Sequence, residues 1–179
     1  NHDSHQVYGQ AAGSIINTGQ EYGDDDENNQ GGQFIQSGGV ATSSVVNASG
    51  LEAVLKGGSA TDTIVNSGGG QSVHGEATGT VLNGGSQWVH DGGVANGTVI
   101  NEAGYQLVKA GATASGTVVN TGSQGGPDAE NSDGQFVSGD VTDTLINANG
   151  RQVIFEGGSA DTTTVKMGGD QSVHGVAKN

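Results

Sequence analysis

The sequence predicts an all-β fold, namely a parallel β-helix (a solenoid) of about eight to nine rungs with about 19 residues in each rung. Three observations predict it: a unit of this length recurs along the chain, its segments are short, β-branched and alternate with period 2, and 35 of the 179 residues are glycine. Glycine at this density, without a 3.6-residue period, excludes helices. Strands of about three to five residues cannot bury their own faces, so the units must stack on one another.

Residues 87–104 form one copy of the unit, whose skeleton is Gln-x-Val, a glycine pair, Ala-x-x-Thr-x-Val-Asn and a closing glycine. We expect the Gln, Val, Ala and Thr side chains to point inward as ladders, and the glycine pairs to lie at corners that need positive φ. The closing asparagines are expected to form a hydrogen-bonded stack at one corner, because asparagine tolerates left-handed backbone and bonds local backbone groups. They are Asn17, Asn47, Asn66, Asn83, Asn101, Asn120 and Asn147, with Lys166 in the eighth place.

A longer repeat is superimposed on the repeat of about 19 residues. Residues 68–75 return as residues 168–175 with one substitution, which indicates that a block of about five rungs has been duplicated. Each copy contains an acidic insertion, at about residues 20–32 and 123–134, and we expect both insertions to protrude as loops. The chain starts and stops inside the pattern. We therefore interpret residues 1–179 as a single β-helix fragment of a longer protein.

Charge and composition exclude several classes of function. The formal net charge is −14, with only five Lys and Arg residues, which argues against binding nucleic acid or an anionic membrane surface. The chain has no cysteine, so disulfide frameworks and thiolate chemistry are excluded. No apolar run approaches the roughly 20 residues that a membrane-spanning helix needs.

The two acidic insertions are the most distinctive departures from the repeat. Clustered carboxylate and amide oxygens suit a hard cation, so calcium is the one cofactor that the sequence suggests. The alternative is a solvated loop, since neither insertion has EF-hand spacing and no confident metal site is predicted. The acidic residues that are candidates for contact or for calcium are Asp24, Asp25, Asp26, Glu27, Asp128, Glu130 and Asp133.

A polar stripe is expected on the outside of the Ala-x-x-Thr-x-Val segment. Short polar side chains repeated at rung spacing make a flat surface that can hydrogen-bond with a copy of itself, and many weak bonds sum by multivalency. The alternative is an ordinary solvent face. The candidate self-association residues are Thr42, Thr61, Asp62, Thr78, Asn96, Ser115, Thr142, Asp143 and Asp161.

The residue after each inward glutamine should point outward, yet several of these residues are large and apolar. They are Phe34, Trp88, Leu107, Phe136 and Val153. An exposed apolar ladder marks a contact surface. Alternatively the acidic insertions cover it, and this is the interpretation that we favour, because they begin immediately upstream of Phe34 and Phe136.

Signatures of an enzyme were sought and are poor. The carboxylates Asp62, Asp143 and Asp161 occupy repeat positions that hold Thr, Ser or Gly in other rungs, whereas a catalytic pair should break the repeat. There is no phosphate-binding loop and no His-Glu-x-x-His motif. His74 and His174 are equivalent repeat positions, which favours a structural role. The sequence therefore predicts no catalytic residues.

Several segments resemble a known family. Residues 1–3 read Asn-His-Asp, 18–23 Thr-Gly-Gln-Glu-Tyr-Gly, 125–131 Gly-Gly-Pro-Asp-Ala-Glu-Asn, and 171–175 Gln-Ser-Val-His-Gly. Together with the rung motif they resemble the passenger domains of self-associating autotransporter adhesins, the antigen 43, AIDA and TibA group, with antigen 43 most similar. The resemblance covers essentially the whole chain. It implies a right-handed parallel β-helix, with the signal peptide, the rest of the passenger and the membrane β-barrel outside this fragment.

The resemblance also implies a function. Such passengers are displayed outside the outer membrane of Gram-negative bacteria and drive cell–cell aggregation and biofilm formation by antiparallel contact with copies on neighbouring cells. Some are heptosylated by a dedicated heptosyltransferase, and the candidate acceptors here are Ser37, Ser59 and Ser159. The sequence thus favours a self-associating adhesin without catalytic activity, with a host surface as a further partner. The alternative is a β-helix that binds or acts on carbohydrate and attaches to host or matrix glycans.

Overall fold

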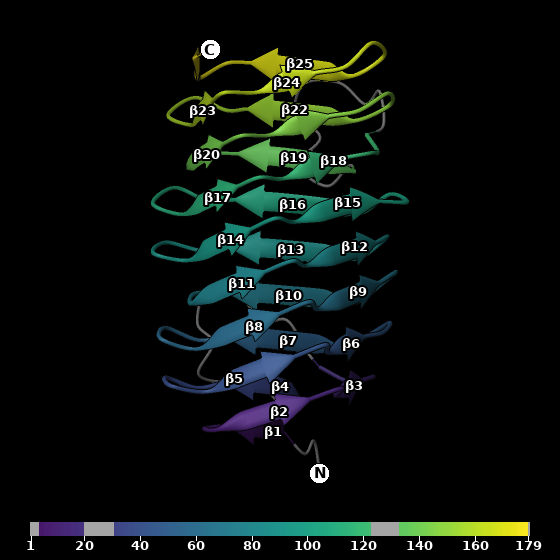
Figure 1. Cartoon of the computed structure of the whole chain (residues 1–179), viewed down its shortest axis with the longest axis vertical. Helices are drawn as coiled ribbons and strands as arrows, with labels where there is room; N and C mark the ends of the chain where they lie inside the picture. Colours follow the sequence, from purple (N-terminus) through teal and green to yellow (C-terminus); the bar gives the residue numbers. More distant parts are fainter. Residues whose placement is uncertain (1–3, 20–30, 123–132, 179) are drawn as a thin grey trace.

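The computed structural model describes residues 4–19, 31–122 and 133–178, which coil into a rod of parallel strands (Figure 1). Three parallel sheets run along the rod, and each turn of the coil, or rung, contributes one strand to each sheet. We call them sheet A, sheet B and sheet C in the order in which the chain meets them. Rung 1 contains β1 to β3, rung 8 contains β22 to β24, and rung 9 contains β25 and β26. The predicted parallel β-helix is confirmed.

The strands are short in all three sheets. Sheet A contains β1 (Ser4–Val7), β4 (Gly32–Ile35), β7 (Leu51–Val54), β10 (Gly70–Val73), β13 (Ser86–Val89), β16 (Tyr105–Val108), β19 (Gly134–Val137), β22 (Arg151–Ile154) and β25 (Asp170–Val173). Sheet B contains β2 (Gln10–Ala12), β5 (Val40–Thr42), β8 (Ser59–Thr61), β11 (Glu76–Thr78), β14 (Val94–Asn96), β17 (Thr113–Ser115), β20 (Asp140–Thr142), β23 (Ser159–Asp161) and β26 (Val176–Lys178). Sheet C contains β3 (Ile15–Ile16), β6 (Val45–Val46), β9 (Ile64–Asn66), β12 (Val81–Asn83), β15 (Val99–Asn101), β18 (Val118–Val119), β21 (Leu145–Ile146) and β24 (Thr164–Val165).

The coil is right-handed. In Figure 1 the strands of sheet A run from right to left at the back, while those of sheet B run from left to right at the front as the chain rises from the N-terminus. This is the hand that parallel strands joined by crossovers almost always adopt. Within the described part of the chain, no helix is long and apolar enough to cross a membrane.

The interior is built from columns of like residues. Valine or isoleucine at the end of each sheet A strand packs against the central alanine or valine of sheet B, as Val89 does near Ala95, and both side chains are fully buried. The second residue of each sheet C strand from β3 to β18 belongs to a separate buried cluster: Ile16, Val46, Val65, Leu82, Ile100 and Val119. Because each rung presents the same residue type at the same place, a limited set of small apolar side chains fills the rod.

A ladder of buried amides runs beside these apolar columns. Gln106 Nε2 donates to Gln87 Oε1 at 2.7 Å, and Gln87 Nε2 donates to Gln71 Oε1 at 2.7 Å. The inward threonines of rungs 3 to 7 join the ladder, as when Thr98 Oγ1 donates to Gln87 Oε1 at 3.1 Å. The glutamines are fully buried, so these bonds satisfy groups that would otherwise be strongly destabilising.

The asparagine stack is confirmed at the turn from sheet C to sheet A. Asn120 Nδ2 donates to Asn101 Oδ1 at 2.8 Å, and Asn147 Nδ2 donates to Asn120 Oδ1 at 2.7 Å. Equivalent bonds join Asn47 to Asn17 and Asn66 to Asn47, both at 2.8 Å. These side chains are only partly buried, so each bond is expected to contribute on the order of 1 kcal/mol to stability.

The glycine pairs lie at corners, as expected. Four lie at the turn from sheet A to sheet B (Gly38-Gly39, Gly57-Gly58, Gly92-Gly93 and Gly157-Gly158) and two at the turn from sheet C to sheet A (Gly84-Gly85 and Gly168-Gly169). In rung 2 the first member, Gly38, has a φ of 79°, in the left-handed region that favours glycine. The second member, Gly39, is needed for a different reason. A Cβ on Gly39 would lie 2.2 Å from the Val7 carbonyl oxygen of the rung below. The first glycine is therefore required by its backbone conformation, and the second because there is no room for a side chain.

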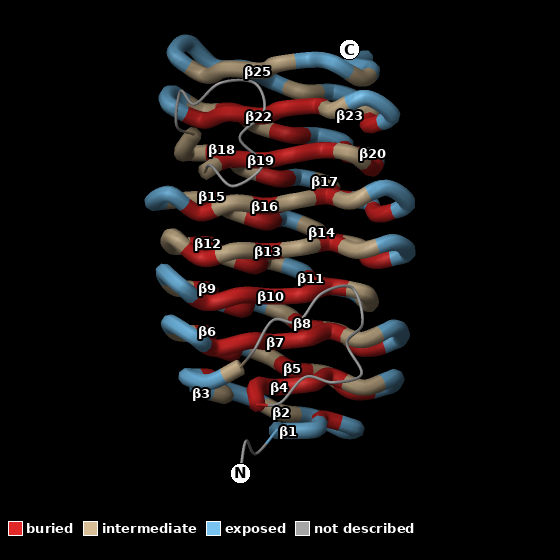
Figure 2. The backbone as a smooth tube through the Cα atoms, turned by 180° about the vertical axis from the view of Figure 1, so that it is seen from behind, coloured by how far each residue is buried: buried red, intermediate tan, exposed pale blue. Residues whose placement is uncertain are grey.

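The outer face of sheet A is mostly buried. Phe34, Phe136 and Val153 are 3%, 1% and 0% exposed, and only Trp88 and Leu107 remain half-buried. Figure 2 shows this face buried along β7 and β10 but alternating between buried and intermediate residues on β13 and β16. Of the two interpretations, an exposed apolar ladder therefore does not hold for Phe34, Phe136 and Val153. The favoured interpretation, that the acidic insertions cover this face, concerns residues 20–30 and 123–132, which lie outside the described residues.

Candidate self-association surface

The predicted polar stripe forms one straight column at the end of the sheet B strands. Strand pairing places its members directly above one another, with Thr78 opposite Asn96 and Asn96 opposite Ser115. All are half-buried or exposed and point away from the core. The column members are Thr42, Thr61, Thr78, Asn96, Ser115, Thr142 and Asp161.

Asp62 and Asp143 belong to a second column, at the corner between sheets B and C. Their φ values of 56° and 54° are left-handed, as is the backbone at the corner residue of other rungs. This conformation aims each corner N–H at the next rung, so Asp62 donates to the Thr78 carbonyl at 2.8 Å and Asp143 to the Asp161 carbonyl at 3.0 Å. These backbone hydrogen bonds hold the corner residues beside the stripe, and the side chains of both aspartates are exposed.

Side-chain hydrogen bonds order the middle of the stripe. Ser115 Oγ donates to Asn96 Oδ1 at 2.8 Å, so the side chains of rungs 5 and 6 are linked. Asn96 Nδ2 in turn reaches Glu76 Oε1 at 3.4 Å, a longer and weaker bond. A stripe whose side chains are already ordered loses less conformational entropy when it binds a partner.

Sequence reasoning missed a third column, on the outside of sheet C. Its members are apolar in seven successive rungs: Ile15, Val45, Ile64, Val81, Val99, Val118 and Leu145, followed by Thr164. Ile15 is 68% exposed and Ile64 38%, while the others up to Leu145 are half-buried. The signal was present in the sequence, since the residue two before each closing asparagine is β-branched or leucine. Successive side chains of a β-strand point to opposite faces. Because the residue that follows is buried, this residue lies on the outside of the rod.

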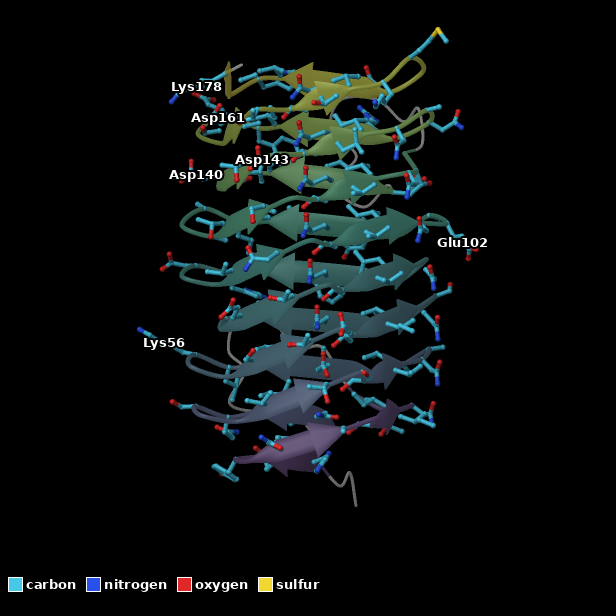
Figure 3. The ribbon with its side chains drawn as sticks, in the orientation of Figure 1. Lys56, Glu102, Asp140, Asp143, Asp161 and Lys178 are labelled. Atoms are coloured by element: carbon cyan, nitrogen blue, oxygen red, sulfur yellow. The ribbon has the colours of Figure 1, made fainter. Side chains whose placement is uncertain are left out.

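Negative charge is concentrated in the upper rungs of this surface. Figure 3 shows Asp140, Asp143 and Asp161 on neighbouring rungs, with Lys178 beside Asp161. Strand pairing places Lys178 directly opposite Asp161. In rungs 1 and 2, by contrast, the stripe and corner positions hold Ala12, Gly13, Thr42 and Ser43, which are uncharged. The surface is therefore electrostatically asymmetric along the rod.

Most of the candidate acidic-loop residues cannot be placed. Asp24, Asp25, Asp26, Glu27, Asp128 and Glu130 lie outside the described residues. Asp133 is described, and its Oδ2 accepts a 2.6 Å hydrogen bond from Thr121 Oγ1 at the base of the second insertion. Within residues 4–19, 31–122 and 133–178, no group of three or more His, Asp or Glu side chains is arranged to hold a metal ion.

The three candidate acceptor serines are accessible to different degrees. Ser37 is exposed in the turn that precedes Gly38. Ser59 and Ser159 begin the sheet B strands β8 and β23 and are half-buried. Both face outward two residues before a stripe position, so a sugar on either one would lie beside the stripe.

Comparison with known proteins agrees with this architecture. A protein family described as AIDA, "Adhesin of bacterial autotransporter system, probable stalk", matches residues 27–85 and 81–123, which together are more than half of the 179 residues. A crystal structure of a TibC-catalysed hyper-glycosylated TibA fragment is similar at 22% sequence identity, over 97% of this chain and 94% of that chain, with a TM-score of 0.36. A structural similarity this distant does not transfer function by itself. The family match is decisive, and the chain belongs to the AIDA family of bacterial autotransporter adhesins, as an adhesin passenger.

Proposed function

We propose that this passenger is a self-associating adhesin, in which the stripe, the corner column and the apolar column of sheet C bind the same surface of a second copy. The observation that supports this most is the alignment of the three columns. In rungs 2 to 7 a polar stripe residue, a left-handed corner and an apolar sheet C residue recur at strand spacing without a break. With rungs about 4.8 Å apart, the surface is a flat strip on the order of 35 Å long.

An antiparallel arrangement is the one that the charges favour. A two-fold axis lying across the rod reverses the order of the rungs but keeps each column opposite itself. A parallel pair would instead place the acidic upper rungs of one copy beside those of the other, where like charges repel. Antiparallel copies bring the acidic rungs 7 and 8 against the neutral rungs 1 and 2.

The charges also favour one register. If the two-fold axis passes through rung 5, Asp62 of one copy faces Asp143 of the other, which is unfavourable. If it passes between rungs 4 and 5, all eight complete rungs overlap, Asp143 faces Ser43, and Asp62 faces Gly116. In this register Thr78 faces Asn96 at the centre. Asp143 then meets a hydroxyl group that can donate to it, and Asp62 meets an uncharged glycine.

Each such contact is weak, and this suits an adhesin. Exposed polar pairs contribute roughly 0–1 kcal/mol each, so a single strip of them gives modest affinity. Many copies on two facing cells raise the effective concentration and make the attachment strong. We infer that the contact forms in trans between passengers at the surface of Gram-negative bacteria and drives autoaggregation and biofilm formation. This role needs no catalytic residue and no cofactor.

We also propose that this passenger is glycosylated. The TibA fragment in the similar crystal structure is hyper-glycosylated, and TibC catalyses that glycosylation. By analogy we propose a heptosyltransferase as a partner of this chain, with Ser37, Ser59 and Ser159 as acceptors. A sugar on Ser59 or Ser159 would flank the stripe and modulate self-association. We propose a host surface as a second binding partner.

The register can be tested with settling assays on cells that display the whole passenger. Ser43→Asp adds a charge opposite Asp143, twice in each symmetric pair, so settling should slow. Ser43 already has a φ of 55°, and aspartate occupies the same corner position at residues 62 and 143, so the fold should tolerate the change. Combining Ser43→Asp with Asp143→Lys should restore settling, because the facing charges then attract.

Asn149→Asp is the matched control for the register test. Residue 149 is exposed, has a φ of 66° and lies at the turn from sheet C to sheet A, away from the stripe. It adds the same charge and should leave settling unchanged. If Ser43→Asp settles like the unmodified passenger, the stripe is not the contact. If Ser43→Asp slows settling but Asp143→Lys does not rescue it, the proposed register is wrong.

A further inference from the structure

A pocket lies on sheet A, near the turns that lead into it from sheet C. Its volume is about 330 Å³, and its described lining includes Leu51, Gly70 and Trp88 with the hydroxyl-bearing Ser49 and Ser86. This is at the lower end of the range of roughly 300–1,000 Å³ that small-molecule sites occupy. Sheet A is at the back of the rod in Figure 1, whereas the stripe is on sheet B at the front. The pocket is therefore separate from the proposed self-association surface.

The pocket lies where one rung begins its sheet A strand with glycine. Leu51, Gly70 and Ser86 are stacked in register as the first residues of β7, β10 and β13. A Cβ on Gly70 would lie 2.6 Å from Cζ3 of Trp88 and 3.7 Å from Cδ1 of Leu51, so the indole lies directly over this glycine. Leu51 is 3% exposed and Gly70 is buried. The accessible lining of the pocket therefore includes the Trp88 ring, Ser49 and Ser86.

The indole that borders the pocket is held in place. Trp88 packs edge-to-face with Tyr105 of the rung above, with ring centroids 5.7 Å apart and an interplanar angle of 80°. Its side chain remains half-buried, so part of the ring stays accessible. A positioned, partly accessible aromatic ring is suited to packing against the C–H groups of a ligand.

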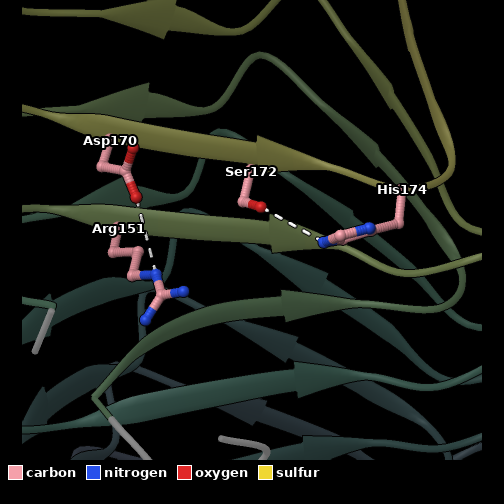
Figure 4. Close-up of polar contacts among 4 residues, drawn as sticks. All are labelled: Arg151, Asp170, Ser172 and His174. Carbon is pink, nitrogen blue, oxygen red and sulfur yellow. Dashed lines mark hydrogen bonds and ion pairs between the residues drawn. The ribbon is translucent and has the colours of Figure 1, made fainter. Parts of the chain in front are cut away.

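Because of the internal duplication, the positions of Leu51 and Gly70 occur a second time in the chain, where other residues take them. The positions of Leu51 and Gly70 are taken by Arg151 and Asp170, whose Nε and Oδ2 atoms lie 3.6 Å apart (Figure 4). Arg151 is only 5% exposed. An ion pair between neighbouring rungs therefore takes in one copy the positions that a leucine and a glycine take in the other.

From these observations we propose that the pocket of rungs 3 to 5 binds one neutral pyranose residue of a glycan. The accessible part of the Trp88 indole receives the apolar C–H face of the sugar. Ser49 and Ser86 hydrogen-bond its hydroxyl groups. The net charge of −14 disfavours acidic sugars. The passenger would then attach to glycans through sheet A independently of its contact with other passengers.

The test is a titration of the isotope-labelled fragment with methyl α-D-mannopyranoside, methyl β-D-glucopyranoside and methyl β-D-galactopyranoside, followed by NMR. At least one pyranoside should shift the Trp88 indole N–H and the Gly70 amide along a saturable curve, with a dissociation constant of about 1 mM (−4.1 kcal/mol). The open-chain alditol sorbitol, which has hydroxyl groups but no ring, should produce no saturable shift.

The double substitution Leu51→Arg with Gly70→Asp is the matched variant. It transfers the pair found at residues 151 and 170, leaves the net charge unchanged and fills the pocket. Its amide spectrum away from rungs 3 to 5 should match that of the original chain, which shows that the fold is intact, and its saturable shifts should disappear. The proposal is overturned if none of the three pyranosides produces saturable shifts. It is equally overturned if the shifts persist in the double variant or if sorbitol reproduces them.

Discussion

Gln71 Nε2 donates a 2.7 Å hydrogen bond to Oε2 of Glu52, the single carboxyl group in the buried amide ladder. The same oxygen accepts a 2.9 Å bond from Thr63 Oγ1. Below it the ladder is broken, because Glu52 Oε1 and both amide atoms of Gln33 have no hydrogen-bond partner. In the rungs above, the glutamine donates its Nε2 to the rung beneath, whereas a carboxylate has no proton to donate. Burial raises the pKa of Glu52, and the hydrogen bonds from Gln71 and Thr63 oppose that shift.

We predict that Glu52→Gln stabilises the rod at neutral pH by roughly 1–3 kcal/mol, the cost of leaving a buried polar group unsatisfied. The folded-state pKa of Glu52 lies above its unfolded value, so the folded state binds the proton more tightly. The stability associated with that proton is complete below the unfolded pKa and is lost as the pH rises through the folded pKa. The advantage of Glu52→Gln should therefore be small in acid and grow toward neutral pH. Urea unfolding followed by circular dichroism across this range measures it.

Gln71→Glu is the reverse control for this prediction. Gln71 is equally buried one rung higher, so a carboxyl group there should destabilise the rod at neutral pH and less so in acid. If Glu52→Gln and the original chain were equally stable at every pH, the buried carboxyl group of Glu52 would not destabilise the rod and the prediction would be wrong.

The asparagine stack supports a second prediction. Asn101 donates to Asn83 Oδ1 at 3.3 Å and accepts from Asn120 at 2.8 Å, so Asn101→Ala removes two bonds and should cost about 1–2 kcal/mol. Asn17→Ala, at the end of the stack, removes the one bond that Asn47 donates and should cost about half as much. Chemical unfolding of both variants compares them. Equal losses would show that the stack does not act bond by bond.

The third prediction concerns the ion pair between Arg151 and Asp170. Asp170→Gly should destabilise the rod by roughly 1–3 kcal/mol, because the buried guanidinium of Arg151 loses its facing carboxylate. Adding Arg151→Leu should recover most of the loss, since the pair then becomes the leucine and glycine that the chain already contains at residues 51 and 70. A double-mutant cycle of thermal or urea unfolding gives the coupling energy. Additive effects of the two substitutions would rule out the interaction.

The sequence was informative wherever the repeat dictates the environment. The inward glutamines, valines and alanines and the asparagine stack were all predictable, because each rung places the same residue between identical neighbours. The outward apolar column of sheet C, which includes Val81 and Val99, followed from the same alternation but was overlooked. Burial of Phe34 and Phe136 was not predictable from alternation. A residue that points away from its own core is buried only if something else packs on it.

By itself, the sequence determined a parallel β-helix with a polar stripe from Thr42 to Asp161. A repeat of about 19 residues places the same type of residue at the same position in successive rungs. The tertiary structure alone decided that Asp62 and Asp143 lie beside the stripe in a separate corner column, because left-handed backbone turns them out of the strand. It alone brought Leu51, Gly70 and Trp88 together around one pocket. These residues come from three rungs and from two different positions in the repeat, and only the direction of each side chain on the folded rod makes them neighbours.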